Sequence, residues 1–165
     1  MARSGPVPVA PNRAPVLPAG FCGSLAHDHG LAVAGVSRHA DVAAIGIDTE
    51  PATALEPGIA AMVLRADEAN IDAHRAFTMK EAAYKAWSSL GGRLLDHHDV
   101  RLLTDGSTFR AEVVADSVVF DGRSVLGGRR WLALVVVTRP TVTARLHHLA
   151  DGDRPDGRRF RPPGR

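Results

Sequence analysis

Three carboxylates and one lysine have the residue types and the spacing to hold a metal ion beside a phosphate. Asp48 and Glu50 lie two residues apart in a stretch that alternates in polarity, so on a strand both would point to one face. Glu81 and Lys85 lie four residues apart in an alanine-rich stretch, so on a helix they would share a face. Hard oxygen ligands with no cysteine nearby suit Mg²⁺ or Mn²⁺ and not zinc.

This set of side chains predicts chemistry on a diphosphate. Mg²⁺ keeps open coordination positions for water and for substrate phosphates. Lys85, one helical turn beyond Glu81, would face the same phosphates. Phosphoryl-type transfer depends mostly on positioning and charge neutralisation, which a metal ion and a lysine supply. The same groups would also serve a Mg²⁺-dependent hydrolase of diphosphate esters.

Lysine is rare in this chain, which uses arginine as its general cation. Lys80 and Lys85 are the two lysines among twenty Lys and Arg residues. An ammonium group is a compact point charge on a flexible stem, whereas a guanidinium is a planar fork, so the segment around them is a candidate for ammonium chemistry. The simpler alternatives are composition bias, a solvated Glu81–Lys85 helix pair worth about 0.3–0.5 kcal/mol, and an acidic edge strand ending in solvent at Asp48 and Glu50.

A helix is expected to carry the two lysines. Asp72 or Thr78 could cap its start, glycines at 91–92 stop it, and Phe77, Tyr84 and Trp87 are expected in the core. Gly46 leaves room for a ligand or a backbone to approach the acidic strand.

The other elements are read from apolar runs and turn residues. Residues 20–30 are expected to form a small-residue loop, followed by a hairpin of strands 31–37 and 42–48. A break at 57–58, a short helix over 59–64 and a surface segment over 65–68 come next. Further strands are predicted over 99–103, 109–120 with a break near Asp116, and 131–138, the last interior in a sheet, with turns at 105–106 and 121–122.

Composition and length restrict the class of protein. A chain of 165 residues suits one domain or a compact pair of lobes. Its net charge of +2 gives no argument for nucleic acid, and one cysteine excludes an intrachain disulfide and fits a reducing cytoplasm. No stretch approaches the roughly 20 apolar residues of a membrane span, and prolines interrupt any signal-peptide pattern. A cytoplasmic protein that binds neither membrane nor nucleic acid is expected.

The predicted organisation is α+β in three segments. Residues 1–19 carry five prolines and predict an extended lead-in. Residues 20–145 form the folded domain, with antiparallel strands and one major helix. Residues 146–165 form a disordered basic tail, for which a solvated role is favoured over contact with an acidic partner.

Two stretches resemble the signatures of the 4′-phosphopantetheinyl transferases. They are Gly46-Ile47-Asp48-Thr49-Glu50 and Phe77-Thr78-Met79-Lys80-Glu81-Ala82-Ala83-Tyr84-Lys85-Ala86, and the block from Pro18 to His27 resembles the family's proline-to-histidine loop. Their order and separation are similar to those of the group that includes the enterobactin synthase component, a siderophore biosynthesis enzyme, and the surfactin-type enzymes. The resemblance covers roughly residues 13 to 138, and three motifs in order are more specific than any one.

The resemblance implies a reaction and a fold. Members of this family move the phosphopantetheine arm of coenzyme A onto a serine of an apo acyl or peptidyl carrier protein, with Mg²⁺, and release adenosine 3′,5′-bisphosphate. The implied fold is a pseudo-dimer of two lobes of antiparallel sheets with packed helices. Its first lobe is incomplete here, because the family has a few tens of residues more ahead of the block at Arg13. A monomer is expected, with self-association possible through exposed surface.

The resemblance also assigns metal ligands and a base. Asp48, Glu50 and Glu81 match the Mg²⁺ ligands, and Mn²⁺ is a possible substitute. Glu81 also matches a group that helps deprotonate the carrier serine, directly or through water.

Further positions match contacts to coenzyme A. Lys85 matches a contact to its phosphates, His27 a contact to its nucleotide end, and Arg13 the basic residue near its 3′-phosphate. Lys80 points away from the Glu81 face and could be structural, and the histidine pairs 97–98 and 147–148 are expected on the surface. The alternative function is a non-catalytic member that binds nucleotide or a partner and transfers nothing.

Overall fold

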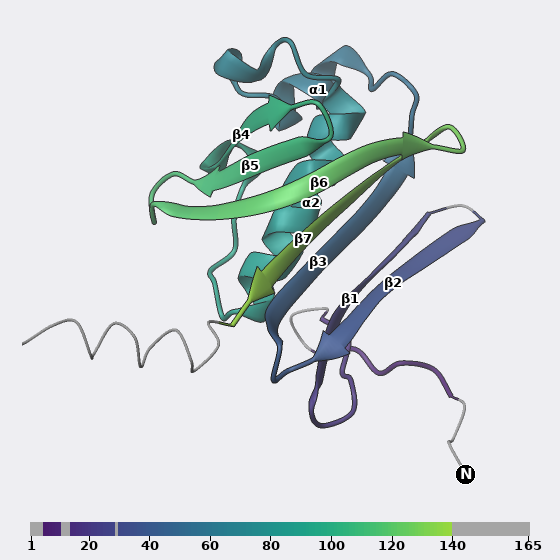
Figure 1. Cartoon of the computed structure of the whole chain (residues 1–165). Coiled ribbons are helices and arrows are strands. Elements are labelled where there is room, and N and C mark those ends of the chain that lie inside the picture. Colours follow the sequence, from purple (N-terminus) through teal and green to yellow (C-terminus); the bar gives the residue numbers. More distant parts are fainter. Residues whose placement is uncertain (1–4, 11–13, 29, 140–165) are drawn as a thin grey trace, which may run out of the picture.

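The computed structural model describes residues 5–10, 14–28 and 30–139, which form two antiparallel sheets and a long helix (Figure 1). In chain order the elements are β1 (Phe21–Asp28), β2 (Leu31–Arg38), β3 (Val42–Pro51), α1 (Pro57–Val63), the 3₁₀ turn η1 (Ala66–Glu68), α2 (Ala73–Ser89), the 3₁₀ turn η2 (His97–Asp99), β4 (Val100–Asp105), β5 (Thr108–Val113), β6 (Val118–Gly127) and β7 (Arg130–Thr138). The expected α+β class, with antiparallel sheets and packed helices, is confirmed.

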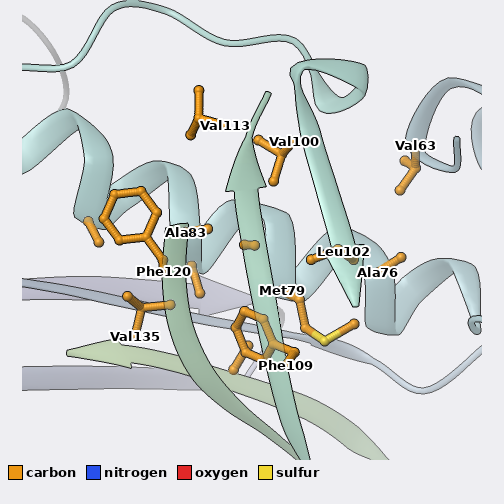
Figure 2. Packing of buried hydrophobic residues seen from close by; sticks show 14 of the residues in the cluster. Val63, Ala76, Met79, Ala83, Val100, Leu102, Phe109, Val113, Phe120 and Val135 are labelled. Atoms are coloured by element: carbon orange, nitrogen blue, oxygen red, sulfur yellow. The ribbon is translucent and has the colours of Figure 1, made fainter. Parts of the chain in front are cut away.

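A five-stranded sheet in the order β3-β7-β6-β5-β4 forms the larger layer, and α2 runs along one of its faces (Figure 1). The predicted strand over 131–138 is interior, since β7 pairs with β3 on one side and β6 on the other. Alternate residues of the strands point at the helix and make the core, with Phe109 and Phe120 its largest members (Figure 2). Burying a side chain of this size stabilises the fold by about 1.5–3 kcal/mol.

The face of α2 that packs on the sheet is built mainly of small residues, not of the expected aromatic stripe. The buried side chains of the whole helix are those of Ala76, Thr78, Met79, Lys80, Ala82, Ala83 and Ala86, and most of them are alanines. Phe77 and Trp87 are partly buried at the margin of the core, and Tyr84 lies outside it. Alanines let the helix backbone approach the sheet, which larger side chains on that face would prevent.

The ends of α2 follow the expected signals. The Asp72 side chain accepts a hydrogen bond from Arg75 N at 2.8 Å, so Asp72 is the cap and Thr78 is not. At the other end Gly91 adopts a φ of 84°, which lets the chain leave the helix.

The segment expected as a small-residue loop is a strand. β1 pairs with β2 along its whole length, and β3 pairs with β7, so the expected hairpin between 31–37 and 42–48 is wrong. A Cβ on Gly23 would lie 2.4 Å from Gly35 O, so the small residues serve close strand approach. The turn between β2 and β3 joins two sheets instead of closing a ladder.

The β1–β2 hairpin lies beside β3 at the edge of the larger sheet (Figure 1). Ile47 N donates to Ser24 Oγ at 3.1 Å, and Gly35 packs against Ile45. Both isoleucines are buried under the hairpin, on the face of β3 opposite α2. The hairpin also carries exposed apolar side chains, such as those of Phe21 and Val36.

Two of the predicted breaks have other roles. The turn at 105–106 closes the β4–β5 hairpin as expected, with Gly106 at a φ of 55°. The predicted turn at 121–122 lies inside β6, where a Cβ on Gly122 would come within 2.3 Å of the Phe109 ring. Pro57 starts α1 instead of breaking the chain, because a proline at the first helical position has no hydrogen bond to lose.

No helix in the described part of the chain is long and apolar enough to cross a membrane. Most of the predicted tail and the boundary at 145 lie outside the described residues, as does Arg13.

Candidate functional site

Helix α2 meets strand β3 at a glycine. A Cβ on Gly46 would lie 1.8 Å from Ala82 O and 2.8 Å from Ala86 N, so any other residue there would push the helix away. The expectation that a backbone approaches Gly46 is therefore confirmed, and the backbone is that of α2. The close approach places Asp48, two residues along the strand, against Lys85 on the helix.

Asp48 and Lys85 form the centre of the site. Lys85 Nζ lies 2.6 Å from Asp48 Oδ1 and also donates to Ile47 O at 3.1 Å and Leu25 O at 3.3 Å. The Asp48 side chain is 8% exposed and that of Lys85 is 28% exposed. The second oxygen of Asp48, Oδ2, is buried with no hydrogen-bond partner in the described structure. Buried carboxylate oxygens normally have a partner, so this one marks a place for a donor or a cation.

Burial raises the pKa of Asp48 to about 6, because a carboxylate loses its hydration at this depth. The Lys85 ammonium lowers the pKa of Asp48 but does not cancel the effect of burial, and the negative charge of Glu81 raises it further. The Glu81 charge therefore acts on Asp48 across the gap between helix and strand.

Glu50 adds a second carboxylate to the same edge of β3. Partial burial raises its pKa, and so do the negative charges of Asp48 and Asp28, while His74 and Lys85 oppose the shift. Asp28 and His74 are site neighbours that the sequence reasoning missed. Asp28 follows His27 directly, and His74 lies seven residues before Glu81 on the same helix face, so both carried a usable signal.

An ion pair holds the end of the hairpin against this edge. Arg130 Nη1, at the start of β7, donates to Asp28 Oδ2. Glu50 pairs with Trp131 in the ladder, next to Arg130. The acidic residues of β1 and β3 are thereby brought together although they are distant in the sequence.

Glu81 is the third predicted metal ligand, and its side chain turns toward η2. Glu81 Oε1 lies 3.4 Å from His97 Nε2, a contact between carboxylate and imidazole. His97 is therefore not the simple surface residue that was expected. Among the described residues no three His, Cys, Asp or Glu side chains are placed so that they could hold a metal ion together. Asp48 and Glu50 lie on β3 at one side of the gap, whereas Glu81 lies on α2 and contacts His97.

The residues nevertheless fit a divalent cation of the magnesium type. Asp48 Oδ2 is a buried oxygen without a partner, and Glu50 and Asp48 repel each other unless a cation lies between them. All three candidate ligands offer hard oxygens, and the one cysteine, Cys22, contacts Val42 O at the other end of β3.

A small cavity opens beside Glu81 on α2. It has a volume of about 220 Å³, and its lining residues are Lys80, Glu81, Tyr84, Leu94, Leu95, Asp96, His97 and Val100. The walls are mostly apolar, so the cavity suits a chain of methylenes and amides more than a bare phosphate.

Lys80 belongs to the interior and not to the open side of the site. Its Nζ lies 2.7 Å from Glu68 Oε2 and donates to the carbonyls of Val63 and His97 at 2.8 and 2.9 Å. Both side chains of the pair are 0–1% exposed, so the expected surface segment over 65–68 is wrong at Glu68. The suggestion that Lys80 is structural agrees with this placement.

Of the two remaining predicted site residues, His27 lies near the site and Arg13 is outside the described residues. His27 is exposed on β1, two residues beyond Leu25, whose carbonyl contacts Lys85. Arg13 is among the residues that the structure does not describe.

Three known proteins that are similar to this chain all belong to one family of transferases. Residues 1–37 match a family model described as the 4′-phosphopantetheinyl transferase N-terminal domain. The chain is 37% identical over 158 residues to the 4′-phosphopantetheinyl transferase Svp of Streptomyces mobaraensis, across 84% of this chain and 64% of that protein. It is 32% identical over 156 residues to the 4′-phosphopantetheinyl transferase Npt of Nocardia iowensis, across 80% and 70%. The transferase PptT of Mycobacterium tuberculosis is 33% identical over 125 residues, across 68% of this chain and 55% of its own length.

Proposed function

Because this chain belongs to the 4′-phosphopantetheinyl transferase family, we propose that it transfers the 4′-phosphopantetheine arm of coenzyme A to a serine of an apo acyl or peptidyl carrier protein. The chain spans 64% of the length of Svp and 55% of that of PptT. The observation that carries the proposal is the meeting of Asp48 and Lys85 at 2.6 Å, with Glu50 and Glu81 beside them. Acidic ligands and an ammonium at one gap suit a metal-assisted reaction at a diphosphate.

The proposed reaction is a displacement at phosphorus. The serine oxygen forms a bond to the phosphorus that carries the pantetheine, and the bond from that phosphorus to the bridging oxygen breaks. The bridging oxygen leaves with adenosine 3′,5′-bisphosphate. The serine proton passes to Glu81, directly or through water.

The proposed roles divide between binding and charge neutralisation. Asp48, Glu50 and Glu81 are the candidate ligands of Mg²⁺, which when bound would neutralise the diphosphate charge. Lys85 exchanges part of its contact with Asp48 for a phosphate oxygen, which its flexible stem permits. His27 and Arg13 are proposed to contact the nucleotide end of coenzyme A.

The cavity beside Glu81 is the proposed place for the pantetheine arm. Its apolar walls, with Tyr84 and Leu95 among them, would exclude water from the arm. Glu81, which also lines the cavity, would face the reacting phosphorus. We place the reaction in the cytoplasm, where coenzyme A and carrier proteins meet.

The direct test is mass spectrometry of the carrier. Purified chain, coenzyme A and Mg²⁺ are incubated with apo carriers from siderophore, polyketide and fatty acid synthesis, because each presents an acceptor serine. A gain equal to one phosphopantetheine arm supports the proposal and identifies the preferred carrier class. Addition of EDTA should abolish the gain.

A further inference from the structure

The Glu81 carboxylate has a protein partner, His97, in addition to its electrostatic interaction with Asp48. Glu81 Oε1 lies 3.4 Å from His97 Nε2, and the two side chains are 28% and 33% exposed. His97 begins η2, a short turn that follows the loop after α2. The contact joins the helix that carries the site to a segment that sequence motifs did not mark.

His97 is held in place by a buried anchor. Lys80 Nζ donates to His97 O at 2.9 Å and lies 2.7 Å from Glu68 Oε2. Glu68 in turn accepts from Leu102 N at 2.7 Å, so the anchor reaches β4. A residue whose backbone is fixed by a 1% exposed lysine has little freedom to move.

The imidazole of His97 is also positioned by its neighbours. Its ring centroid lies 5.2 Å from that of Phe77, one turn before Glu81 on α2. The turn itself is closed at both ends by side chains, since Asp96 accepts from His98 N and Asp99 accepts from Asp96 N, both at 3.0 Å. The imidazole is therefore presented to Glu81 by a rigid support.

On strand β3, Asp48 has a buried oxygen that lacks a partner among the described residues. Asp48 Oδ2 is unpaired in the described structure, and the negative charge of Glu81 acts on Asp48. No three candidate ligands are gathered there in the described residues while Glu81 faces His97. Glu81 thus has two competing partners, the imidazole or a cation beside Asp48.

We propose that His97 is a positioning residue that holds the Glu81 carboxylate away from the metal point, the place beside Asp48 and Glu50 where a divalent cation would bind. Glu81 must then leave His97 to become a ligand. The proposal rests on the proposed function for the identity of the metal point. Its consequence is that His97 lowers the affinity of the chain for a divalent ion. A partly exposed contact of this kind contributes at most about a fivefold change in affinity.

Direct Mn²⁺ binding tests this role without any turnover. Free Mn²⁺ is measured by electron paramagnetic resonance during titration of the wild-type chain, His97→Ala, His97→Gln and His98→Ala at one fixed pH. We expect His97→Ala to bind Mn²⁺ roughly two- to fivefold more tightly than wild type. His97→Gln, which keeps a polar side chain beside Glu81, should fall between the two.

His98→Ala is the matched control. His98 is the neighbouring histidine, is exposed, and contacts Ala61 O instead of Glu81. Its affinity for Mn²⁺ should equal that of wild type, and melting temperatures of all variants show whether the fold is kept. A general loosening of η2 would change the Mn²⁺ affinity of His98→Ala as well, and His97→Gln would then not differ from His97→Ala.

Two results overturn the proposal. One is a His97→Ala chain that binds Mn²⁺ no more tightly than wild type, including the case in which neither binds. The other is equal tightening in the His98→Ala control. If the carrier is not modified but His97→Ala still binds Mn²⁺ more tightly than wild type, the proposed function is contradicted and the role of His97 stands.

Discussion

Lys85 Nζ lies 2.6 Å from Asp48 Oδ1, and the two residues belong to a helix and a strand that touch through Gly46. The ammonium thus occupies the position of a cation beside a buried carboxylate. Because Lys85 has three protein acceptors here, it is held at the gap before any substrate arrives.

Replacement of Lys85 should weaken coenzyme A binding. Loss of one charge-assisted contact is worth about 1.5–3 kcal/mol, so Lys85→Met should raise the coenzyme A dissociation constant by roughly ten- to a hundredfold in calorimetry. Lys85→Arg should recover only part of the lost coenzyme A affinity, because a planar guanidinium cannot replace a compact ammonium among three acceptors. Wild-type affinity in Lys85→Met would reduce the residue to a structural partner of Asp48.

Asp48 should make stability depend on pH between about 4 and 6. Its pKa is raised from 3.8 to about 6 by folding, so the folded state binds this proton more tightly than the unfolded state. The contribution favours folding below pH 4 and is lost as the pH rises through 6. Asp48→Asn should therefore gain stability relative to wild type by about 2–3 kcal/mol from pH 4 to 7.

Urea unfolding of both chains across this pH range measures the effect. Asp121→Asn, at a carboxyl 78% exposed on β6, serves as the control and should change by no more than about 0.5 kcal/mol. A difference between wild type and Asp48→Asn that stays flat from pH 4 to 7 would contradict the burial of an ionisable Asp48.

The buried pair of Lys80 and Glu68 should dominate the stability of the segment around α1 and η2. Lys80→Met leaves a buried carboxylate without its cation and should cost about 3–5 kcal/mol in the free energy of unfolding. The double change Lys80→Met with Glu68→Gln removes both charges and keeps an acceptor for Leu102 N, so it should recover part of the loss.

An exposed pair provides the comparison. Arg110 and Asp121 are 64% and 78% exposed, and Arg110→Met should change stability by less than about 1 kcal/mol. If Lys80→Met were as mild as Arg110→Met, Lys80 would not be the anchor described above.

Gly46 should tolerate no side chain. Gly46→Ala places a Cβ within 1.8 Å of a helix carbonyl, so α2 must shift, at a cost of at least about 1–3 kcal/mol and with weaker coenzyme A binding. Gly58→Ala in α1, with nothing within 4 Å, should instead stabilise the chain by about 0.5–1 kcal/mol. Equal stability of the two variants would contradict the close helix–strand contact.

The sequence was sufficient where local pattern decides structure. The cap at Asp72, the stop at Gly91 and the apolar run of β7 each follow from a short-range rule. It failed where small residues serve tertiary contact: glycines and alanines between 20 and 30 predicted a loop, although they allow β1 and β2 to pack closely.

The site was predictable in part for the same reason. Two-residue spacing on a strand and four-residue spacing on a helix brought Asp48 and Lys85 forward as candidates, and they are in contact. Periodicity along one element cannot show which distant residues come to meet it. Asp28 reaches Glu50 through strand packing, and His97 reaches Glu81 through a loop held by a buried lysine.

The mass of an apo carrier protein, before and after incubation with this chain, coenzyme A and Mg²⁺, tests the central claim most directly. We predict that the carrier gains one phosphopantetheine arm when it is incubated with the wild-type chain or with Asp121→Asn. It should gain none when it is incubated with Asp48→Asn. The carrier must first be shown to accept the arm from a proven transferase. An unmodified carrier would then contradict the proposed transfer: bound coenzyme A without product would indicate a non-catalytic binder, and adenosine 3′,5′-bisphosphate without a modified carrier would indicate a hydrolase.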